Sequence, residues 1–303
     1  MRDEIQEKFP EMQFSVPLSR HCTFLVGGPA DYFYEAKTGE IIPELISFAR
    51  THSLPYLIIG GGSNLLFDDE GFRGLVIKIN LQNIERDNDK VTADAGVSVA
   101  ELLFFTIQNG LQGLEKWIGL PGTVGGAVVG NAGCNGLETK DILISATILN
   151  PENGQTKLAL PDYFNYSYRH SALKESGEIV LKATFQLQKS KLTKDEQTAL
   201  MREIKQERQE KQPFGLSSGS FFKNPSPENP AGMLIDRAGL KGTKIGNAQI
   251  SEKHGNFLLN LGGATSKDLK ELARLTKHEV QAKFGIELQE EVQIISTNGK
   301  AKL

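Results

Sequence analysis

The spacing of apolar side chains along the chain predicts a fold in which helices and strands are mixed. Residues 41–52 repeat apolar side chains at helical spacing, which places on one face Ile41, Ile42, Leu45, Ile46 and Ala49. Short apolar runs typical of strands occur at Tyr56–Ile59, Leu75–Ile79, Lys90–Ala95, Ile142–Leu149, Gln155–Leu160 and Ile179–Leu187. The polar run Glu85–Asp89 is expected to separate two of these strands, and Asn153-Gly154 is a hairpin turn signal between two others.

Capping boxes mark where two helices begin. In such a box a serine or threonine is followed three residues later by a glutamate, and each side chain bonds the other's backbone N–H. Residues 98–101 open an apolar helix that we expect to end at Gly110. Residues 193–196 open a charged helix that runs through about Glu210 and is stopped by Pro213. The charges of this second helix are expected to face solvent.

The last hundred residues predict a further unit of mixed helix and strand. Its expected elements are a helix near Asn229–Ala238, a strand at Phe257–Asn260, a helix from Thr265 or Ser266 to Phe284, and a strand at Ile286–Ile295. Gly285 is expected to end the long helix. Because the composition changes after Ser190, we divide the chain into three segments, 1–80, 81–192 and 193–303.

Two stretches rich in glycine and free of charge stand out between these elements. One is Gly60-Gly61-Gly62-Ser63-Asn64, called here the glycine loop, which follows the strand at Tyr56–Ile59. The other is residues 119–136, GLPGTVGGAVVGNAGCNG, called here the glycine-rich stretch. Glycine lets the backbone approach a ligand closely, and exposed backbone N–H groups without nearby carboxylates favour phosphate. Two such loops suggest one long phosphate-bearing ligand held at two points, although either alone is equally compatible with a tight turn.

Composition and charge exclude several classes of protein. The chain has 303 residues, a formal net charge of −3 and an isoelectric point near 6.0, so nothing indicates binding to nucleic acid or to an acidic membrane. It lacks an apolar run of about 18 residues, the length that a membrane helix needs, and its first residues lack the apolar core of a signal peptide. We therefore expect a cytoplasmic protein.

Cysteine and histidine spacing gives no sign of a metal site. The two cysteines, Cys22 and Cys134, lie far apart, and no C-x-x-C or H-E-x-x-H pattern occurs. The glycine loop also fails the dinucleotide fingerprint G-x-G-x-x-G, because Leu65 stands at the place of the third glycine. A Walker G-x-x-x-x-G-K-[ST] motif is absent too. The phosphate-bearing ligand must therefore be held outside the two commonest nucleotide folds.

Motifs along nearly the whole chain resemble the UDP-N-acetylenolpyruvoylglucosamine reductase family. The glycine-rich stretch, through Pro121–Ala127 and Asn131–Gly133, is similar to its FAD loop, and the glycine loop with Leu65 and Leu66 is similar to its second flavin loop. The other matching motifs, in family order, are the entry strand Thr23–Ala30, Tyr168–Ser171, Gly219–Pro225, Leu234–Gly242, Ser251–His254 and Leu288–Val292. Eight motifs in order make the resemblance specific.

The resemblance implies an α+β fold of PCMH type. Two α+β subdomains would bind FAD, residues 1–80 and 81–192, with the FAD domain covering about 22–188 overall. Residues 193–303 would form a C-terminal α/β domain that binds substrate. The implied enzyme holds FAD without a covalent bond, uses NADPH as co-substrate, and reduces the enolpyruvyl group of UDP-N-acetylglucosamine-enolpyruvate to UDP-N-acetylmuramate for peptidoglycan. We expect it to act on small molecules as a monomer.

The same resemblance assigns roles to individual residues. Arg169 would hold the substrate carboxylate, Ser220 would donate the proton, and Glu291 would orient or polarise the intermediate. The cofactor-binding residues would be Gly60, Gly61, Gly62, Ser63, Asn64, Pro121, Gly122, Thr123, Gly125, Gly126, Ala127 and Asn131. Substrate-binding candidates are Lys211, Lys223, Asn224 and His254. By residue type alone, an arginine is more often a surface ion pair and a serine more often a turn or cap.

The sequence departs from the family pattern at two places. The final motif usually reads L-E-P-E-V but here reads L-Q-E-E-V, so Glu291 is kept while Glu290 replaces a proline and puts the local turn in doubt. One subclass carries a tyrosine that closes over substrate, in a segment before the serine motif. Here the last tyrosine is Tyr168, so the chain resembles the shorter subclass without this lid.

Two other functions remain open on the sequence. Another flavoenzyme of PCMH type, such as an oxidase with covalent FAD, would carry a linking histidine near the first loop, and residues 57–66 hold none. A flavin- or nucleotide-binding module without catalysis would not need Arg169, Ser220 and Glu291 together. Turnover of NADPH that depends on the enolpyruvyl sugar nucleotide separates all three functions.

The first prediction concerns the cofactor. The purified protein is expected to be yellow, and acid denaturation is expected to release free FAD, because no histidine stands beside the glycine loop to form a link. An absorption spectrum of the supernatant after precipitation measures this. Flavin that remains with the precipitate contradicts non-covalent binding.

Overall fold

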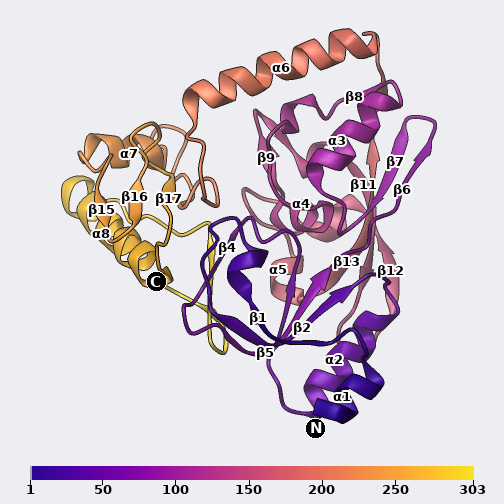
Figure 1. Ribbon diagram of the computed structural model, residues 1–303. Coiled ribbons are helices and arrows are strands. Elements are labelled where there is room, and N and C mark those ends of the chain that lie inside the picture. Colours follow the sequence, from indigo (N-terminus) through magenta and orange to yellow (C-terminus); the bar gives the residue numbers. More distant parts are fainter. Residues whose placement is uncertain (1) are drawn as a thin grey trace.

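The first of two main sheets is built from the N-terminal part of the chain. The computed structural model describes residues 2–303. Four strands lie in the order β1 (Gln13–Pro17), β2 (Pro29–Ala36), β5 (Phe72–Ile79) and β3 (Tyr56–Ile59). The last three run parallel, and β1 is antiparallel to β2. Helix α2 (Ile41–Thr51) connects β2 to β3, and α1 (Arg2–Lys8) lies beside it (Figure 1).

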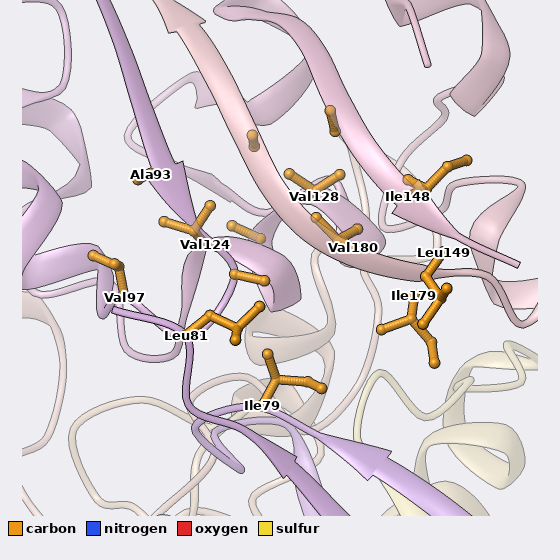
Figure 2. Close-up of a cluster of buried hydrophobic side chains, with 14 of the residues drawn as sticks. Ile79, Leu81, Ala93, Val97, Val124, Val128, Ile148, Leu149, Ile179 and Val180 are labelled. Atoms are coloured by element: carbon orange, nitrogen blue, oxygen red, sulfur yellow. The ribbon is translucent and has the colours of Figure 1, made fainter. Parts of the chain in front are cut away.

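The second main sheet is antiparallel throughout. Its order is β12 (Thr156–Ala159), β11 (Leu143–Leu149), β13 (Ile179–Gln186), β7 (Lys90–Asp94) and β6 (Ile84–Asp87). The helices α3 (Val99–Gln108) and α4 (Val124–Gly130) lie on it (Figure 1). Figure 2 shows Val124 and Val128 of α4 in one buried cluster with Ala93 of β7 and Val180 of β13. The apolar face of α4 thus fixes the glycine-rich stretch to the sheet.

Helix α4 lies inside the glycine-rich stretch, where no helix was predicted. Glycine lowers helix propensity, so three glycines in seven residues hide the helix from a pattern search. The structure supplies a reason for one of them. A Cβ added at Gly125 would lie 2.8 Å from the Cβ of Ala95, closer than packed carbons allow. Small residues therefore let this helix approach the sheet.

The C-terminal part forms a separate lobe that is joined to the rest by a long helix. Helix α6 (Lys194–Lys211) crosses from the second sheet to this lobe (Figure 1). The lobe contains α7 (Ala231–Arg237), α8 (Ser266–Phe284) and an antiparallel sheet of β15 (Lys244–Ile245), β16 (Ala248–Ile250) and β17 (Leu258–Asn260). No helix among residues 2–303 is long and apolar enough to cross a membrane.

The end of the chain returns to the N-terminal part. Strand β18 (Gln293–Ser296) runs parallel to β4 (Leu65–Phe67), which follows the glycine loop directly. β19 (Gly299–Ala301) then pairs antiparallel with β18. The strand predicted at Ile286–Ile295 is therefore correct only from residue 293 on. The residues before it are held by an isolated bridge between Phe222 and Glu290 instead.

Buried side chains form two clusters that share the first sheet. Strand β5 is buried on both faces, and alternation along it sends Leu75 and Ile77 into one cluster and Val76 into the other. The first cluster fills the space between the two main sheets, and the second joins the first sheet to the C-terminal lobe. The boundaries at residues 80 and 192 remain predictions.

Most helices and strands expected from the sequence are present. The capping boxes at Ser98, Thr193 and Thr265 are formed, and Gly285 ends α8 in a left-handed conformation. Two further expectations were wrong in part. The polar run Glu85–Asp89 is mostly strand β6, whose exposed edge gives no apolar signal, and the entry strand expected at 23–30 begins only at Pro29.

Shorter elements complete the chain. They are β8 (Leu111–Gln112), β14 (Gln188–Lys189), β9 (Gly133–Cys134), β10 (Leu137–Glu138), α5 (Leu173–Ser176) and the 3₁₀ turns Leu18–His21, Glu115–Trp117, Thr139–Asp141 and Pro161–Phe164. β8 pairs with β14, and β9 pairs with β10.

A second prediction concerns how the lobes are held together. The carboxylate of Asp69 accepts hydrogen bonds from the backbone N–H groups of Ser266 (2.7 Å) and Lys267 (3.0 Å) at the start of α8. Asp69→Ala is expected to lower the free energy of unfolding by about 1–2 kcal/mol, the scale of a lost helix cap. Urea denaturation followed by circular dichroism measures it. Asp89→Ala, at an exposed turn, is the control, and equal stability of both variants would contradict the cap.

Candidate active site

The glycine loop and the glycine-rich stretch are in direct contact. A Cβ added at Gly60 would lie 2.4 Å from Thr123 Oγ1, and one added at Gly122 would lie 2.6 Å from Ser63 Oγ. Strand β3 leads into the first loop, and the second loop leads into α4, so both are anchored in the core. Only glycine permits this approach, and it brings two of the predicted cofactor-binding segments together.

Polar groups without a partner face this junction. Thr123 Oγ1 is buried and has no hydrogen-bond partner in the protein, and the same holds for Thr23 Oγ1 in the neighbouring segment. Within residues 2–303, the backbone N–H groups of Gly61, Gly62 and Ser63 also donate to no protein acceptor. Buried donors and acceptors are normally paired. Unpaired donors in a loop without charge therefore fit a phosphate-bearing ligand.

The remaining predicted cofactor residues differ in their surroundings. Pro121 and Gly126 are exposed, whereas Ala127 is buried in the core cluster. A Cβ at Gly126 would have Thr123 Oγ1 as its nearest neighbour, at 3.7 Å, so a side chain fits there. Asn64 lies at the end of the glycine loop, where its Nδ2 donates to the carbonyl oxygen of Glu291 at 3.0 Å.

The side chain of Asn131 forms hydrogen bonds inside the protein, which the sequence did not indicate. Its side chain is fully buried, and its Nδ2 donates to Glu138 Oε2 (3.1 Å) and to the carbonyl oxygen of Ser167 (3.0 Å). Its Oδ1 accepts from the backbone N–H of Lys140 at 3.1 Å. These bonds tie the glycine-rich stretch to the turn that carries Arg169. A cofactor contact by Asn131 would therefore have to use its backbone.

Arg169 is held in a tight turn with unusual backbone geometry. Ser167 and His170 pair across the turn, and Arg169 has φ +56°, in the left-handed region that residues other than glycine seldom adopt. Its guanidinium donates from Nη2 to the carbonyl oxygen of Gly133 at 3.3 Å and lies 5.2 Å from the ring centre of Tyr168. The turn thus directs Arg169 toward the glycine-rich stretch.

Two of the three predicted catalytic residues, Arg169 and Glu291, form an ion pair. Nε of Arg169 lies 2.7 Å from Oε1 of Glu291, and the two side chains are 22% and 18% exposed. Nε is buried against this carboxylate and Nη2 donates to Gly133, whereas Nη1 donates to no acceptor within residues 2–303. An arginine has five N–H donors in a fixed plane. The pair therefore leaves a donor free for a further anion, such as a substrate carboxylate.

The segment around Glu291 is anchored from several sides. The backbone N–H of Glu291 donates to the carbonyl oxygen of Phe221 at 2.9 Å, and that of Gln293 donates to Asn64 at 3.0 Å. Burial raises the pKa of the Glu291 carboxyl, and the positive charges of Arg169, Lys174 and Lys223 oppose this shift. The net direction is upward. Glu291 is thus a carboxyl that holds a proton more readily than an exposed glutamate.

Ser220 lies one residue from the Phe221 carbonyl that binds Glu291. It pairs by an isolated bridge with Phe257, and it is half-buried. Among residues 2–303 its hydroxyl has no hydrogen-bond partner. The hydroxyl is therefore neither a helix cap nor a turn bond, the two ordinary uses of serine. The structure brings Ser220 into the same neighbourhood as the ion pair.

The four predicted substrate-binding residues divide into two groups. Lys223 is near enough to Glu291 to lower its pKa, and the backbone N–H of Asn224 donates to the hydroxyl of Tyr168 at 3.4 Å. Lys211 is exposed at the end of α6, and no ion pair is found for it within residues 2–303. His254 packs in the C-terminal lobe, where burial and then the charge of Lys241 lower its pKa.

Arg208 was missed because the charges of its helix were expected to face solvent. It is half-buried, and its Nη1 donates to the carbonyl oxygen of Ile118 (3.1 Å) and to the sulfur of Cys134 (3.0 Å). These contacts bind the end of α6 to the glycine-rich stretch. Lys253 reinforces the junction from the C-terminal lobe, because its Nζ donates to the carbonyl oxygen of Gln209 at 2.6 Å. No local pattern marks such contacts, since the partners are distant in sequence.

Glu290, which stands at the position of the expected proline, is also engaged. Its carboxylate forms an ion pair with Lys277 of α8, and the two side chains are 20% and 27% exposed. Its backbone pairs with Phe222. The glutamate thus fixes the segment to α8, and the doubt about the local turn is answered for this chain.

Comparisons with known proteins agree with this geometry. Residues 209–295 match the family model of the UDP-N-acetylenolpyruvoylglucosamine reductase C-terminal domain, and residues 30–158 match that of an FAD binding domain. Relatives named UDP-N-acetylenolpyruvoylglucosamine reductase are 44% identical in Chlamydia trachomatis, over 95% of this chain and 98% of the relative, and 40% identical in Bacillus velezensis, over 93% of each.

A solved structure confirms the fold. The crystal structure of UDP-N-acetylenolpyruvylglucosamine reductase from Thermus caldophilus is 36% identical, with a TM-score of 0.78 over 93% of this chain and 99% of that one. The predicted α+β fold of PCMH type with a C-terminal domain is therefore confirmed, as is the prediction of FAD as cofactor. On its sequence and its fold alike, the chain belongs to the UDP-N-acetylenolpyruvoylglucosamine reductase family.

Proposed function

We propose that the chain is an FAD-containing, NADPH-dependent reductase that converts UDP-N-acetylglucosamine-enolpyruvate to UDP-N-acetylmuramate, a precursor of peptidoglycan. The observation that supports this most strongly is the Arg169–Glu291 ion pair, whose Nη1 has no protein acceptor within residues 2–303, beside two uncharged glycine segments. A flavin-binding module without catalysis has no need for a partly buried charge pair with a free donor. Family membership supplies the substrate class.

The two glycine segments fit the phosphates of FAD. The unpaired N–H groups of Gly61, Gly62 and Ser63 and the unpaired hydroxyl of Thr123 would hold them, and no carboxylate lies in either segment. When bound, FAD supplies the hydride chemistry, since it takes hydride from NADPH and gives it to the enolpyruvyl double bond. All other steps below depend on side chains of the protein.

Arg169 would bind and polarise the enolpyruvyl carboxylate. When hydride adds to the methylene carbon, negative charge grows on the neighbouring carbon and on its carboxylate, and a positive group in place stabilises it. The guanidinium is charged at every working pH and can hold a carboxylate with two hydrogen bonds. Its fixed turn and its contact with Gly133 would hold it in this orientation before substrate arrives.

Ser220 would donate the proton to the carbon that carries this charge. A hydroxyl is a weak acid, so it can act only on a strongly basic centre that it touches. Glu291, with its pKa raised by burial, would hold the intermediate in place and keep Arg169 aligned. Lys223, whose charge acts on Glu291, and Asn224, which contacts Tyr168, would assist substrate binding. Roles for Lys211 and His254 remain predictions, as do a monomeric state, a cytoplasmic location, and the absence of nucleic-acid and membrane partners.

A third prediction tests the phosphate cradle. Gly126→Asp is expected to lose FAD while the C-terminal lobe stays folded, because the added carboxylate repels phosphate and the site has room for the side chain. The ratio of flavin to protein absorbance after gel filtration measures the loss. Gly126→Ala adds volume without charge and is expected to keep most of its FAD. An aspartate variant with stoichiometric FAD would show that Gly126 does not face the phosphates.

A fourth prediction separates the two halves of the reaction. Ser220→Ala is expected to leave bleaching of the flavin by NADPH near its normal rate, because that half needs no proton for the sugar nucleotide. Reoxidation by the enolpyruvyl substrate should slow by about 10²–10⁴-fold, the scale for a positioned acid. This corresponds to roughly 3–5 kcal/mol of barrier. Anaerobic stopped-flow absorbance follows both halves in one sample.

Two outcomes of this experiment count against Ser220. If both halves slow together, the substitution has disturbed the flavin site and the serine is structural. If neither slows, another group donates the proton. Ser217→Ala, three residues earlier in the same loop, is the matched control and is expected to change neither rate.

A further inference from the structure

Lys174 is a half-buried lysine that the chemistry proposed above does not use. It lies in α5, five residues after Arg169, and its Nζ donates a hydrogen bond of 2.6 Å to the carbonyl oxygen of Arg169. Lysine is seldom buried unless it has a partner, and the partner of this lysine's charged amine is a backbone carbonyl oxygen. Such a contact fixes the direction of the peptide that follows Arg169.

Lys174 binds the backbone of Arg169, whose conformation is strained. Arg169 has φ +56°, and residues other than glycine persist in this region only where their surroundings hold them there. The turn is further fixed by the hydroxyl of Ser171, which donates to the carbonyl oxygen of Val129 at 2.7 Å. Relaxing the turn toward ordinary φ values would swing the Arg169 side chain away from Glu291.

We propose that Lys174 is a positioning residue, which holds Arg169 in its left-handed conformation and thereby aims the guanidinium at Glu291 and at the substrate carboxylate. The part about substrate rests on the function proposed above, whereas the part about Glu291 does not. Lys174 touches neither the ion pair's carboxylate nor any predicted cofactor residue by a hydrogen bond within residues 2–303. Its action is therefore through Arg169.

The charges around Glu291 provide a readout that is independent of substrate. Arg169 from the turn, Lys174 from α5 and Lys223 from the loop after Ser220 all lower the pKa of Glu291 against the effect of burial. Lys300 of β19 adds a further positive charge near Lys174. Removing the charge of Lys174, and letting Arg169 move away, both shift the pKa of Glu291 upward. The direct loss of charge raises the pKa of Glu291 to the same extent with or without Arg169, so the part of the shift that disappears in an Arg169→Met background reports positioning.

The test uses the full-length holoenzyme and three variants. Lys174→Met keeps the length and apolar stem but removes the donor and the charge, and Lys174→Arg keeps both. Lys182→Met, at an exposed position of β13, is the matched control. The pKa of Glu291 is followed by NMR of ¹³C-labelled glutamate carboxyls, with the signal assigned by its loss in Glu291→Gln. Flavin content and both half-reactions are measured on the same samples.

Lys174→Met is expected to keep its flavin and its rate of bleaching by NADPH, to raise the pKa of Glu291, and to slow reoxidation by substrate by roughly 10- to 100-fold, the scale of a displacement of about 1 Å. Lys174→Arg is expected to restore both toward wild type, and Lys182→Met to change neither. If Lys174→Met leaves the pKa of Glu291 and the reoxidation rate unchanged, the proposal is overturned.

Other outcomes are equally decisive. If Lys174→Met does not fold, Lys174→Arg decides. A fully active variant is the expected result, whereas one that slows reoxidation without moving the pKa of Glu291 would overturn the proposal, because the rate would then fall with Arg169 still in place. A pKa shift that depends on Arg169, in a protein whose wild type does not turn over the enolpyruvyl substrate, would support positioning while refuting the proposed function. Loss of flavin or of NADPH bleaching in Lys174→Met would overturn the positioning role, because the defect would then lie in the cofactor site.

Discussion

The ion pair between Arg169 and Glu291 depends on the correct placement of nearly every other part of the structure. Its two residues come from distant parts of the chain, one from a turn between strands of the second sheet and one from the segment before the last hairpin. Both charges are largely removed from water, so a pair with one partner missing is strongly destabilising. The pair can form only when the C-terminal lobe, the first sheet and the turn are all in register. A site built this way assembles as a consequence of folding, and in the proposed function it leaves an arginine donor for the substrate.

The glycine-rich stretch connects this pair to the cofactor. At one end Gly122 and Thr123 meet the glycine loop, and at the other end Gly133 accepts a hydrogen bond from Arg169. Between these ends, α4 is fixed to the second sheet by its apolar face (Figure 2). Rigid elements hold functional groups more accurately than loops do. One short, core-anchored segment thus sets the position of the arginine and would also form part of the proposed phosphate cradle.

The sequence predicted local features well and long-range contacts poorly. Capping boxes, the α8 stop at Gly285 and most strands depend on neighbouring residues, and their patterns could be read directly. Helix α4 was hidden because its three glycines lower helix propensity, and one of them, Gly125, is needed for close packing on the sheet. Arg208, Lys174 and Asn131 find partners through the turn or the fold, so residue type and spacing gave no signal for their roles. The three catalytic candidates were named through family resemblance, since an isolated arginine, serine or glutamate carries no pattern of its own.

The central claim is that this chain passes hydride from NADPH to an enolpyruvyl sugar nucleotide through a bound flavin. Anaerobic stopped-flow absorbance of the wild-type protein tests it most directly. NADPH is expected to bleach the flavin, and UDP-N-acetylglucosamine-enolpyruvate, added without oxygen, is expected to restore the oxidised spectrum while UDP-N-acetylmuramate appears in equal amount. A bleached flavin that the enolpyruvyl substrate fails to reoxidise would contradict the account.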